Sequence, residues 1–422
     1  MNRPYSAYKD SGIEWIGQVP QDWKVNRLKT ACVFTYGDSL ANEDRIDGNI
    51  PVYGSNGIVG YHNKAITHKP CIIIGRKGSY GKVNFSQTEC FPIDTTYFID
   101  DRSVKCNLEW LQYVLPLLEL DKFSKDTGVP GLNREDAHDK RVPVPESSVQ
   151  KAIATYLDRK TAQIDDLIAK KEKMIELLKE ERTAIINQAV TKGLDPKVEM
   201  KDSGIEWLGK MPKHWEIKKL KFNALIQFSN VNKKSEEGEL PVRLCNYVDV
   251  YYNDFITPEL DFMEATASPE EIRKFQLKVE DVIVTKDSEE WNDIAIPAYV
   301  VSWIPNLICG YHLAQIRPDQ LLMRGKYLFW LLSANSINYQ YMIEASGVTR
   351  YGLGNYALSN SMILIPPLGE QDKIADFLDR KTGQIDAQVV REQKSIGYLC
   401  EFRVSLISEV VTGKIDVRGY AA

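Results

Sequence analysis

The sequence lacks the features that mark membrane, secreted and metal-binding proteins. It has no apolar run of about 18 residues, so no transmembrane helix is expected. The N-terminus has no apolar segment of the kind found in secretory signals. The seven cysteines include no Cys-x-x-Cys pair, and the five histidines show no metal-ligand spacing. We therefore expect a cytoplasmic protein with reduced thiols and no metal site.

Catalytic motifs are also missing. There is no Asp/Asn-Pro-Pro-Tyr/Phe motif of an amino-methyltransferase, no glycine fingerprint for a methyl donor, no Walker motif and no Gly-x-Ser-x-Gly. Glu199-Met200-Lys201 holds the Glu-x-Lys half of a nuclease site, but no Pro-Asp half lies upstream in a recognisable strand. The net charge is −5, although residues 48–88 contain no acidic side chain. The net charge taken globally argues mildly against nucleic-acid binding, but the charge distribution is compatible with a local basic surface. The sequence therefore offers candidate binding elements without a reaction centre.

Two stretches of the chain are present twice. Residues 9–29 align with 201–221 at a constant offset of 192, and 12 of the 21 positions are identical. Residues 150–165 align with 371–386 at an offset of 221, with 11 of 16 identical. The material between these stretches does not visibly repeat. A period near 200 residues is too long for a solenoid and indicates tandem duplication of a domain plus a connector.

The connector in each half is predicted to be a helix of about 40 residues, hence about 60 Å long. Residues at spacings of three, four and seven form one stripe along the helix, and every position of this stripe is apolar in both copies. The positions are Ile153, Leu157, Ile164, Ile168, Ile175, Leu178, Ile185 and Ala189, then Ile374, Leu378, Ile385, Val389, Ile396, Leu399, Leu406 and Val410. Gly193 and Gly413 lie just past the predicted ends, where a C-cap glycine is expected. We expect the two helices to bury their stripes against each other as a coiled coil. The alternative is that each helix packs on its own domain.

The two inserts, about residues 24–141 and 216–361, are predicted to be mixed α/β. Apolar runs at Cys71–Ile74 and Asp281–Thr285 predict strands, and residues 108–120 and 326–333 predict helices. The sequence does not predict their topology.

In the first insert, two polar loops are candidates for ligand contacts. One is Tyr53-Gly54-Ser55-Asn56-Gly57, and the other is Gly75-Arg76-Lys77-Gly78-Ser79-Tyr80-Gly81-Lys82, which follows a predicted strand. Glycines allow a close approach to phosphate, Arg can bond guanine O6 and N7, and Asn can bond adenine. The glycine spacing is not that of a P-loop, so a nucleoside triphosphate site is not implied. The alternative is a solvated β-turn.

In the second insert, the loop Thr285–Ile294 also follows a predicted strand and is polar with one aromatic side chain. It could contact base edges or merely end the strand. Ser346–Tyr351 stands where Thr127–Pro130 stands in the first half, and both could be structural loops.

These residues together resemble the specificity (S) subunit of Type I restriction–modification systems. The resemblance rests on Asp10–Trp15 through Trp23 with the second copy Asp202–Trp215, and on Val144-Pro145 and Ile365-Pro366, each followed by Leu-Asp-Arg-Lys-Thr. Tyr53–Gly57, Gly75–Gly78 and Lys286-Asp287-Ser288 are also similar to that family. The ordered double set of motifs spans essentially the whole chain.

The resemblance implies a mixed α/β fold with a pseudo-two-fold internal repeat. Two target recognition domains, residues 1–146 and 196–367, would be joined by two long antiparallel coiled-coil helices within 147–195 and 368–422. Each domain would bind one half of a bipartite double-stranded DNA site. The helices would set the unread spacer and dock two methyltransferase (M) subunits. Because DNA rises about 3.4 Å per base pair, a connector of about 60 Å spans more than one turn. The unlike inserts imply an asymmetric site.

The resemblance also implies partners and cofactors. S-adenosylmethionine would bind the M subunits, and ATP and Mg²⁺ would bind restriction (R) subunits, so this chain would bind no cofactor itself. The candidate DNA contacts are Tyr53, Ser55, Asn56, Arg76, Lys77, Ser79, Tyr80 and Lys82 in the first half, and Lys286, Ser288, Trp291, Asn292 and Arg350 in the second. Two alternatives are a fused methyltransferase–nuclease with its own recognition domains, and a coiled-coil assembly protein that does not bind DNA.

Overall fold

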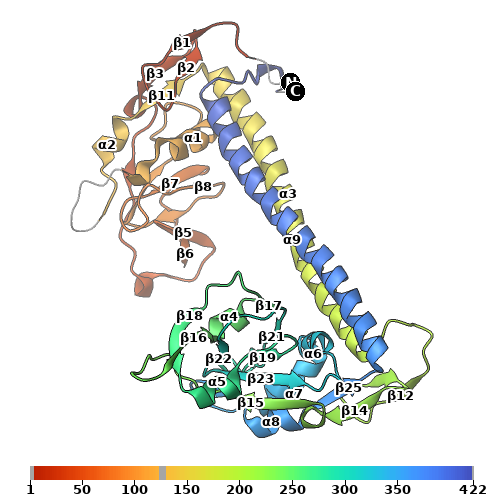
Figure 1. Cartoon of the computed structure of the whole chain (residues 1–422). Helices are drawn as coiled ribbons and strands as arrows, with labels where there is room; N and C mark the ends of the chain where they lie inside the picture. Colours follow the sequence, from red (N-terminus) through yellow and green to blue (C-terminus); the bar gives the residue numbers. More distant parts are fainter. Residues whose placement is uncertain (1–3, 123–129, 421–422) are drawn as a thin grey trace. The chain divides into compact units, whose positions relative to one another are not determined.

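The computed structural model describes residues 4–122 and 130–420. The chain divides into two compact units, one of residues up to 171 together with those from 394 onward, and one of residues 172–393. Each unit contains one insert and one half of each long helix (Figure 1). No helix in the described ranges has the length and hydropathy needed to cross a membrane.

The first unit contains two short framework ladders and two sheets. The ladders are antiparallel pairs, β1 (Tyr8–Asp10) with β2 (Gln18–Pro20) and β3 (Lys24–Arg27) with β11 (Arg141–Val144). The larger sheet is antiparallel, in the order β4 (Thr35–Tyr36), β10 (Thr96–Ile99), β7 (Cys71–Gly75), β8 (Val83–Ser86). In the smaller sheet, β5 (Ile50–Gly54) lies between antiparallel β6 (Gly57–His62) and parallel β9 (Phe91–Pro92). The short helices are α1 (Leu108–Val114) and α2 (Arg134–His138).

The second unit repeats this framework. β12 (Met200–Asp202) pairs with β13 (Lys210–Pro212), and β14 (Glu216–Lys219) with β25 (Met362–Ile365). The larger sheet has the order β15 (Ala224–Phe228), β23 (Leu313–Pro318), β19 (Val282–Thr285), β21 (Pro297–Val300), β17 (Phe255–Ile256). In the smaller sheet, β16 (Leu240–Cys245) lies between β18 (Met263–Ala267) and β22 (Leu307–Cys309). The remaining elements are β20 (Asp287–Ser288), β24 (Tyr351–Gly352), α4 (Tyr247–Tyr251), α5 (Pro269–Phe275), α6 (Gly325–Leu332), α7 (Asn335–Glu344) and α8 (Asn355–Asn360).

The two inserts share a topology although their sequences do not visibly repeat. The order β4-β10-β7-β8 corresponds to β15-β23-β19-β21. The strand β5, with one antiparallel and one parallel neighbour, corresponds to β16. A core accepts many combinations of apolar side chains, provided that volume and pattern are kept, so topology can persist when identity is lost. The duplication therefore includes the inserts as well as the framework.

Three of the four elements predicted within the inserts are confirmed, at β7, β19 and α6. The predicted helix over residues 108–120 is wrong at its C-terminal end. α1 ends at Val114, and a 3-10 turn follows over Leu115–Leu118. Pro116 cannot donate a backbone hydrogen bond, and Glu119 has a left-handed φ of 50°. Both features stop an α-helix.

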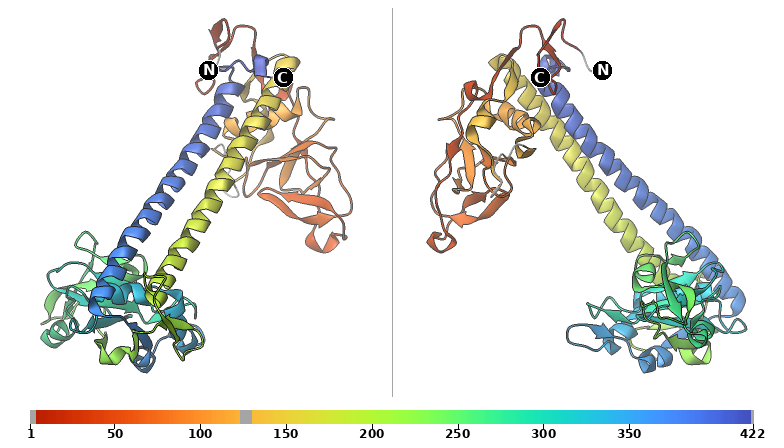
Figure 2. Two further views of the ribbon diagram at one scale, coloured as in Figure 1. Left: turned by 90° about the vertical axis from the view of Figure 1, so that its right-hand side faces the viewer. Right: turned by 60° about the vertical axis from the view of Figure 1, so that its left-hand side comes forward.

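The long helices are α3 (Ser147–Lys192) and α9 (Leu368–Val411), and they run side by side (Figure 2). None of the stripe positions is exposed. In the first unit Arg403 Nε bonds Asp165 Oδ1 at 3.0 Å, and in the second Arg182 Nε bonds Asp386 Oδ1 at 3.1 Å. Each pair joins an early residue of one helix to a late residue of the other, so the helices are antiparallel. The two pairs correspond under the offset of 221, and the prediction that the helices pair as a coiled coil is confirmed.

The repeated framework residues hold the helix ends. Gly413 has φ +77°, and a Cβ there would collide with Pro20 and meet Trp23 at 3.0 Å. Gly193 has φ +74°, and its Cβ would lie 3.3 Å from Trp215. Each lead segment (residues 9–29 and 201–221) thus packs a fully buried tryptophan against the end of a long helix. This packing explains why Pro and Trp recur in both copies.

We expect the stability of the first unit to depend on pH through His138. The ring is buried at the end of α2, and its Nε2 accepts a hydrogen bond from the Phe34 amide at 3.1 Å. Burial lowers the pKa of His138 below its ordinary value of 6.5. The unfolded chain therefore binds more protons, and folding stability is lost as pH falls below about 6.5. Thermal unfolding of His138→Gln should depend less on pH between 7 and 5 than that of the wild type. An equal pH dependence would contradict this account.

Candidate nucleic-acid interface

The basic loop of the first insert begins where the buried strand β7 ends. The Gly81 amide donates to Gly75 O at 2.8 Å, which closes the loop, and Gly78 and Gly81 have φ of +72° and +77°. A Cβ at Gly75 would collide with the backbone oxygen of Ser79. The glycine spacing is therefore required by the turn itself. The loop leaves Lys77, Ser79 and Lys82 exposed, with Tyr80 partly buried.

The two polar loops of the first insert meet at Lys82 and Asn56. Lys82 Nζ donates to Asn56 Oδ1 at 2.8 Å and to Asn56 O at 3.0 Å. Both side chains line an open cavity of about 560 Å³ together with Ser79 and Tyr80. The structure thus brings four of the predicted contacts into one cavity, where amide, hydroxyl and ammonium groups can bond base edges or phosphate.

Tyr53 and Ser55 are the two candidates of this half whose side chains are buried. Tyr53 packs with Cys71, Ile73 and Cys90, and burial raises the pKa of its hydroxyl. Ser55 donates to Thr95 O at 2.6 Å. Both side chains hold the end of β5 in place, and the structure does not present them to a ligand.

Arg76 is anchored through its backbone. Its amide donates to Thr95 O at 2.8 Å, and its carbonyl accepts from the Leu132 amide at 2.8 Å. Its guanidinium carbon lies 5.3 Å from the centroid of the Tyr36 ring, which is a cation–π distance.

Lys286 occupies the equivalent place in the second insert. Its amide donates to His312 O at 3.1 Å, and its carbonyl accepts from the Leu353 amide at 2.7 Å. Its Nζ lies 4.5 Å from the Tyr311 ring centroid and 5.7 Å from that of Phe228. Phe228 ends β15, as Tyr36 ends the corresponding strand β4. Each insert therefore has a cation on an aromatic ring at the same point of the same topology.

The other candidates of the second insert are only partly brought together. Strand β20 pairs Ser288 with Tyr351 of β24, the residue that follows Arg350 in the sequence. Ser288 is buried, whereas Arg350, Trp291 and Asn292 are exposed. The loop that carries Trp291 and Asn292 is tied to α4 by Tyr251, whose hydroxyl donates to Asp293 at 2.7 Å. That hydrogen bond raises the pKa of Tyr251 to about 12. Residues 127–129, the counterpart of the Arg350 loop, lie outside the described residues.

Comparison with known proteins identifies the family. The sequence profile described as "Type I restriction modification DNA specificity domain" matches residues 20–177 and again 212–393. The chain belongs to this family. It is a DNA specificity subunit of a Type I restriction–modification system, the non-catalytic component of that enzyme.

Individual relatives agree with this assignment. The MjaVIII specificity subunit of Methanocaldococcus jannaschii is 24% identical, over 95% of each chain. The EcoKI specificity subunit of Escherichia coli K12 is 21% identical over 66% of this chain and 58% of its own length. The solved HsdS subunit from Thermoanaerobacter tengcongensis has a TM-score of 0.55 at 14% identity, and the two chains are covered to 94% and 98%. A second structure, titled as a study of complex assembly of the type I R-M system, has a TM-score of 0.70 at 13% identity, with 94% and 99% covered. These structures share the fold.

Four residues that were not among the predicted DNA contacts of this specificity subunit lie beside Arg76 or Lys286. They are Tyr36 and Arg134 in the first insert, and Asp287 and His312 in the second. One signal could have found Arg134. The offset of 221 extends upstream to Gly131-Leu132 and Gly352-Leu353, so this segment belongs to the shared scaffold. No comparable signal marks Tyr36, because strand β4 is only two residues long.

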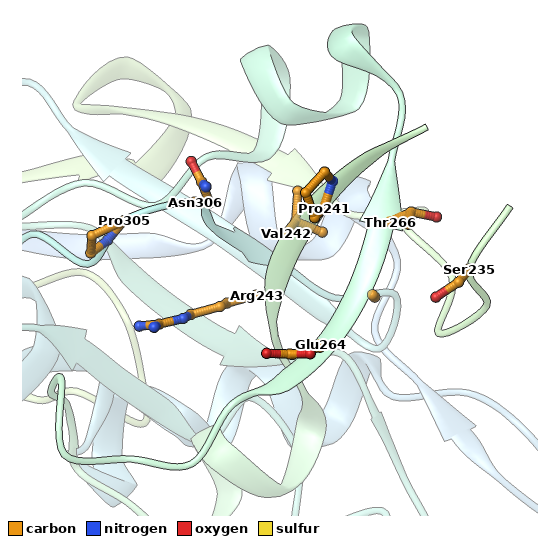
Figure 3. A pocket seen from close by; sticks show the side chains of 9 residues that line it. Ser235, Pro241, Val242, Arg243, Glu264, Thr266, Pro305 and Asn306 are labelled. Carbon is orange, nitrogen blue, oxygen red and sulfur yellow. The ribbon is translucent and has the colours of Figure 1, made fainter. Parts of the chain in front are cut away.

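Two further features do not point to a ligand. An open pocket of about 590 Å³ lies on the sheet of β16 and β18 (Figure 3), where Arg243 and Glu264 are cross-strand neighbours and their charges balance. His68, Asp100 and Asp101 lie close enough to share a metal ion. However, His68 Nδ1 bonds Asp101 at 2.8 Å, and the buried Asp100 is paired with Arg102. These contacts account for the cluster without a metal.

Proposed function

We propose that this specificity subunit recognises a bipartite, asymmetric site in double-stranded DNA. Each insert, acting as a target recognition domain, would bind one half of the site. The observation that carries the proposal is the equivalent placement of Arg76 on Tyr36 and of Lys286 on Tyr311 and Phe228. The shared position supports a shared task, and cations on anchored loops suit the DNA backbone. The unlike side chains around each cation support two different half-sites.

The candidate side chains that are exposed or partly buried would have two kinds of contact with DNA. Basic members, Arg76, Lys77, Lys82, Lys286 and Arg350, would contact phosphates or bases. Asn56, Ser79, Tyr80, Trp291 and Asn292 would bond base edges or stack on them. The buried Tyr53, Ser55 and Ser288 would position the loops.

We assign the helix pair a second role, in setting the spacer and docking two methyltransferase subunits. Each helix carries large apolar side chains that stay exposed beside its buried stripe. They are Leu167, Met174 and Leu177 on α3, and Val390, Tyr398, Phe402 and Val404 on α9. Exposed apolar side chains in such number favour a protein partner.

The remaining partners and cofactors follow from the same assignment. Restriction subunits would join the assembly of this chain and two methyltransferase subunits. S-adenosylmethionine would bind the methyltransferase subunits, ATP and Mg²⁺ the restriction subunits, and this chain would need no cofactor. Since genomic DNA is the target, the complex would work in the cytoplasm.

Mapping methylated adenines tests the proposal. The full chain would be co-expressed with its methyltransferase subunit in a host that lacks other adenine methylation. We expect one motif of two unlike half-sites separated by an unread spacer. A continuous motif or a palindrome would overturn the bipartite asymmetric site. Methylation by the purified chain alone would instead support a fused enzyme, and no sequence-selective binding with the methyltransferase subunit present would support a pure assembly protein.

A further inference from the structure

Two arginines in the first insert share one aromatic ring. The guanidinium carbon of Arg76 lies 5.3 Å from the Tyr36 centroid, and that of Arg134 lies 5.2 Å from the same centroid. Both side chains line a cavity of about 320 Å³, which Lys77 and Asn133 also line. Three cationic side chains, from two segments far apart in the sequence, therefore line one small cavity.

The charge of this cavity is not balanced from within. Among the described residues that line it, Glu135 is the one carboxylate, and its side chain is 73% exposed. Its Oε1 lies 3.5 Å from Arg134 Nε, a contact that solvent screens. The Nε atoms of Arg76 and Arg134 are buried and have no hydrogen-bond partner in the described part of the chain. Arginines that line one small cavity without a buried carboxylate favour an anion there.

The scaffold holds both arginines in place before any ligand arrives. Arg76 is fixed by backbone hydrogen bonds on both sides, to Thr95 and from Leu132. Arg134 follows Asn133, whose Oδ1 accepts from the Glu135 amide at 2.8 Å and fixes the start of α2. The Tyr36 ring packs on Tyr97 at 5.0 Å, and Tyr97 donates to Leu132 O at 3.1 Å. Preorganised donors of this kind lower the entropy lost on binding.

The second insert, as far as the structure describes it, has no such pair of arginines on one ring. Leu132 and Leu353 correspond, because each donates its amide to the carbonyl of the equivalent cation, Arg76 or Lys286. Two residues further on, the counterpart of Arg134 is Asn355. The counterpart of Lys77, which follows Arg76, is Asp287, which follows Lys286. Asp287 Oδ2 bonds His312 Nδ1 at 2.7 Å. Lys286 is the remaining cation, and its Nζ already donates to Ser229 O at 3.1 Å. At these corresponding, described positions the pair of arginines is therefore found in the first insert and not in the second.

We propose that Arg76 and Arg134 jointly bind one phosphate of the DNA backbone at the first half-site, with Tyr36 holding both guanidinium groups. The inference rests on the proposed function and adds to it a ligand group and the residue Arg134. A phosphate presents several anionic oxygens, so two planar forks can each donate to it. Such a contact fixes the register of the domain on the duplex and carries no sequence preference.

The test measures how binding of 40-base-pair duplexes of randomised sequence depends on salt, using the full chain with its methyltransferase subunit. Arg134→Ala should weaken binding to all sequences alike and reduce the slope of log K against log salt by about one. Arg134→Lys should keep the slope because the charge remains. Arg141→Ala, which removes an exposed arginine from β11 outside this cavity, is the matched control and should change neither.

The double variant Arg76→Ala/Arg134→Ala sharpens the test. If both residues bind the same phosphate, their effects are coupled, and the slope falls by about one in the double variant as in each single one. A fall of about two would show separate phosphates and overturn the joint site. An altered base preference among the bound duplexes would show base contact and overturn it as well. If the wild type binds DNA and Arg134→Ala has the same slope of log K against log salt, the joint phosphate site is wrong but the proposed function stands. If the wild type binds no duplex, the proposed function fails with it.

Discussion

Adding one heptad to both long helices should lengthen the spacer of the DNA target by about three base pairs. Residues 168–174 of α3 and 389–395 of α9 would be duplicated in one variant. Seven helical residues add about 10 Å, and B-DNA rises about 3.4 Å per base pair. The stripe keeps its phase because Ile168 and Ile175, like Val389 and Ile396, are seven residues apart. Mapping methylated adenines should find both half-sites unchanged and the gap longer.

The ion pairs between the helices distinguish a matched insertion from an unmatched one, which serves as the control. Asp165–Arg403 and Arg182–Asp386 flank both insertion points, so matched insertions preserve the two pairs. A four-residue insertion in α3 alone would shift Arg182 by about one turn from Asp386 and offset the stripes. We expect that variant to lose stability and methylation. An unchanged spacer in the matched variant, with methylation intact, would refute the helix pair as the element that sets the spacing.

The framework could be predicted from the sequence because its residues are tied to fixed partners. Gln150 and Gln371, which correspond under the offset of 221, illustrate this. Gln150 accepts from the Asn107 amide and donates to Pro145 O, each at 2.8 Å. Gln371 accepts from the Arg324 amide at 2.8 Å and donates to Pro366 O at 2.9 Å. A glutamine that satisfies both ends of its amide in this way cannot be exchanged without leaving buried polar groups unpaired. Such positions keep their identity in both copies and reveal the repeat.

The inserts could not be predicted in the same way. Their common topology rests on apolar strands such as β7 and β19, in which Ile72 and Ile74 correspond to Val282 and Val284. The Arg76–Tyr36–Arg134 cluster joins three separate segments, and sequence reasoning found only the one with the glycine signal. The motif that contains Tyr53 and Ser55 is polar and glycine-flanked, yet both side chains are buried at the end of β5. Strand alternation could not be read there, because the pairing of β5 with β6 shifts register between Val52 and Tyr53.

Single substitutions in the two inserts should relax the two half-sites independently. Asn56→Ala removes an amide from the cavity that it shares with Lys82, Ser79 and Tyr80. Trp291→Ala removes a side chain that is 48% exposed on the polar loop of the second insert. A lost base contact costs about 1–3 kcal/mol, hence roughly 5- to 160-fold at one base pair. Asn56→Ala should broaden the methylated motif within one half-site only, and Trp291→Ala within the other only.

The two variants control each other, because each leaves the opposite insert, the helix pair and the methyltransferase subunits untouched. The independence follows from the structure, since the two residues belong to different compact units with separate cores. Distant substitutions without shared partners act additively, so the double variant should broaden both half-sites by the sum of the single effects. Broadening of both half-sites by either single variant would mean that one insert does not correspond to one half-site. No change in either half-site, with methylation intact, would remove that residue from the DNA interface.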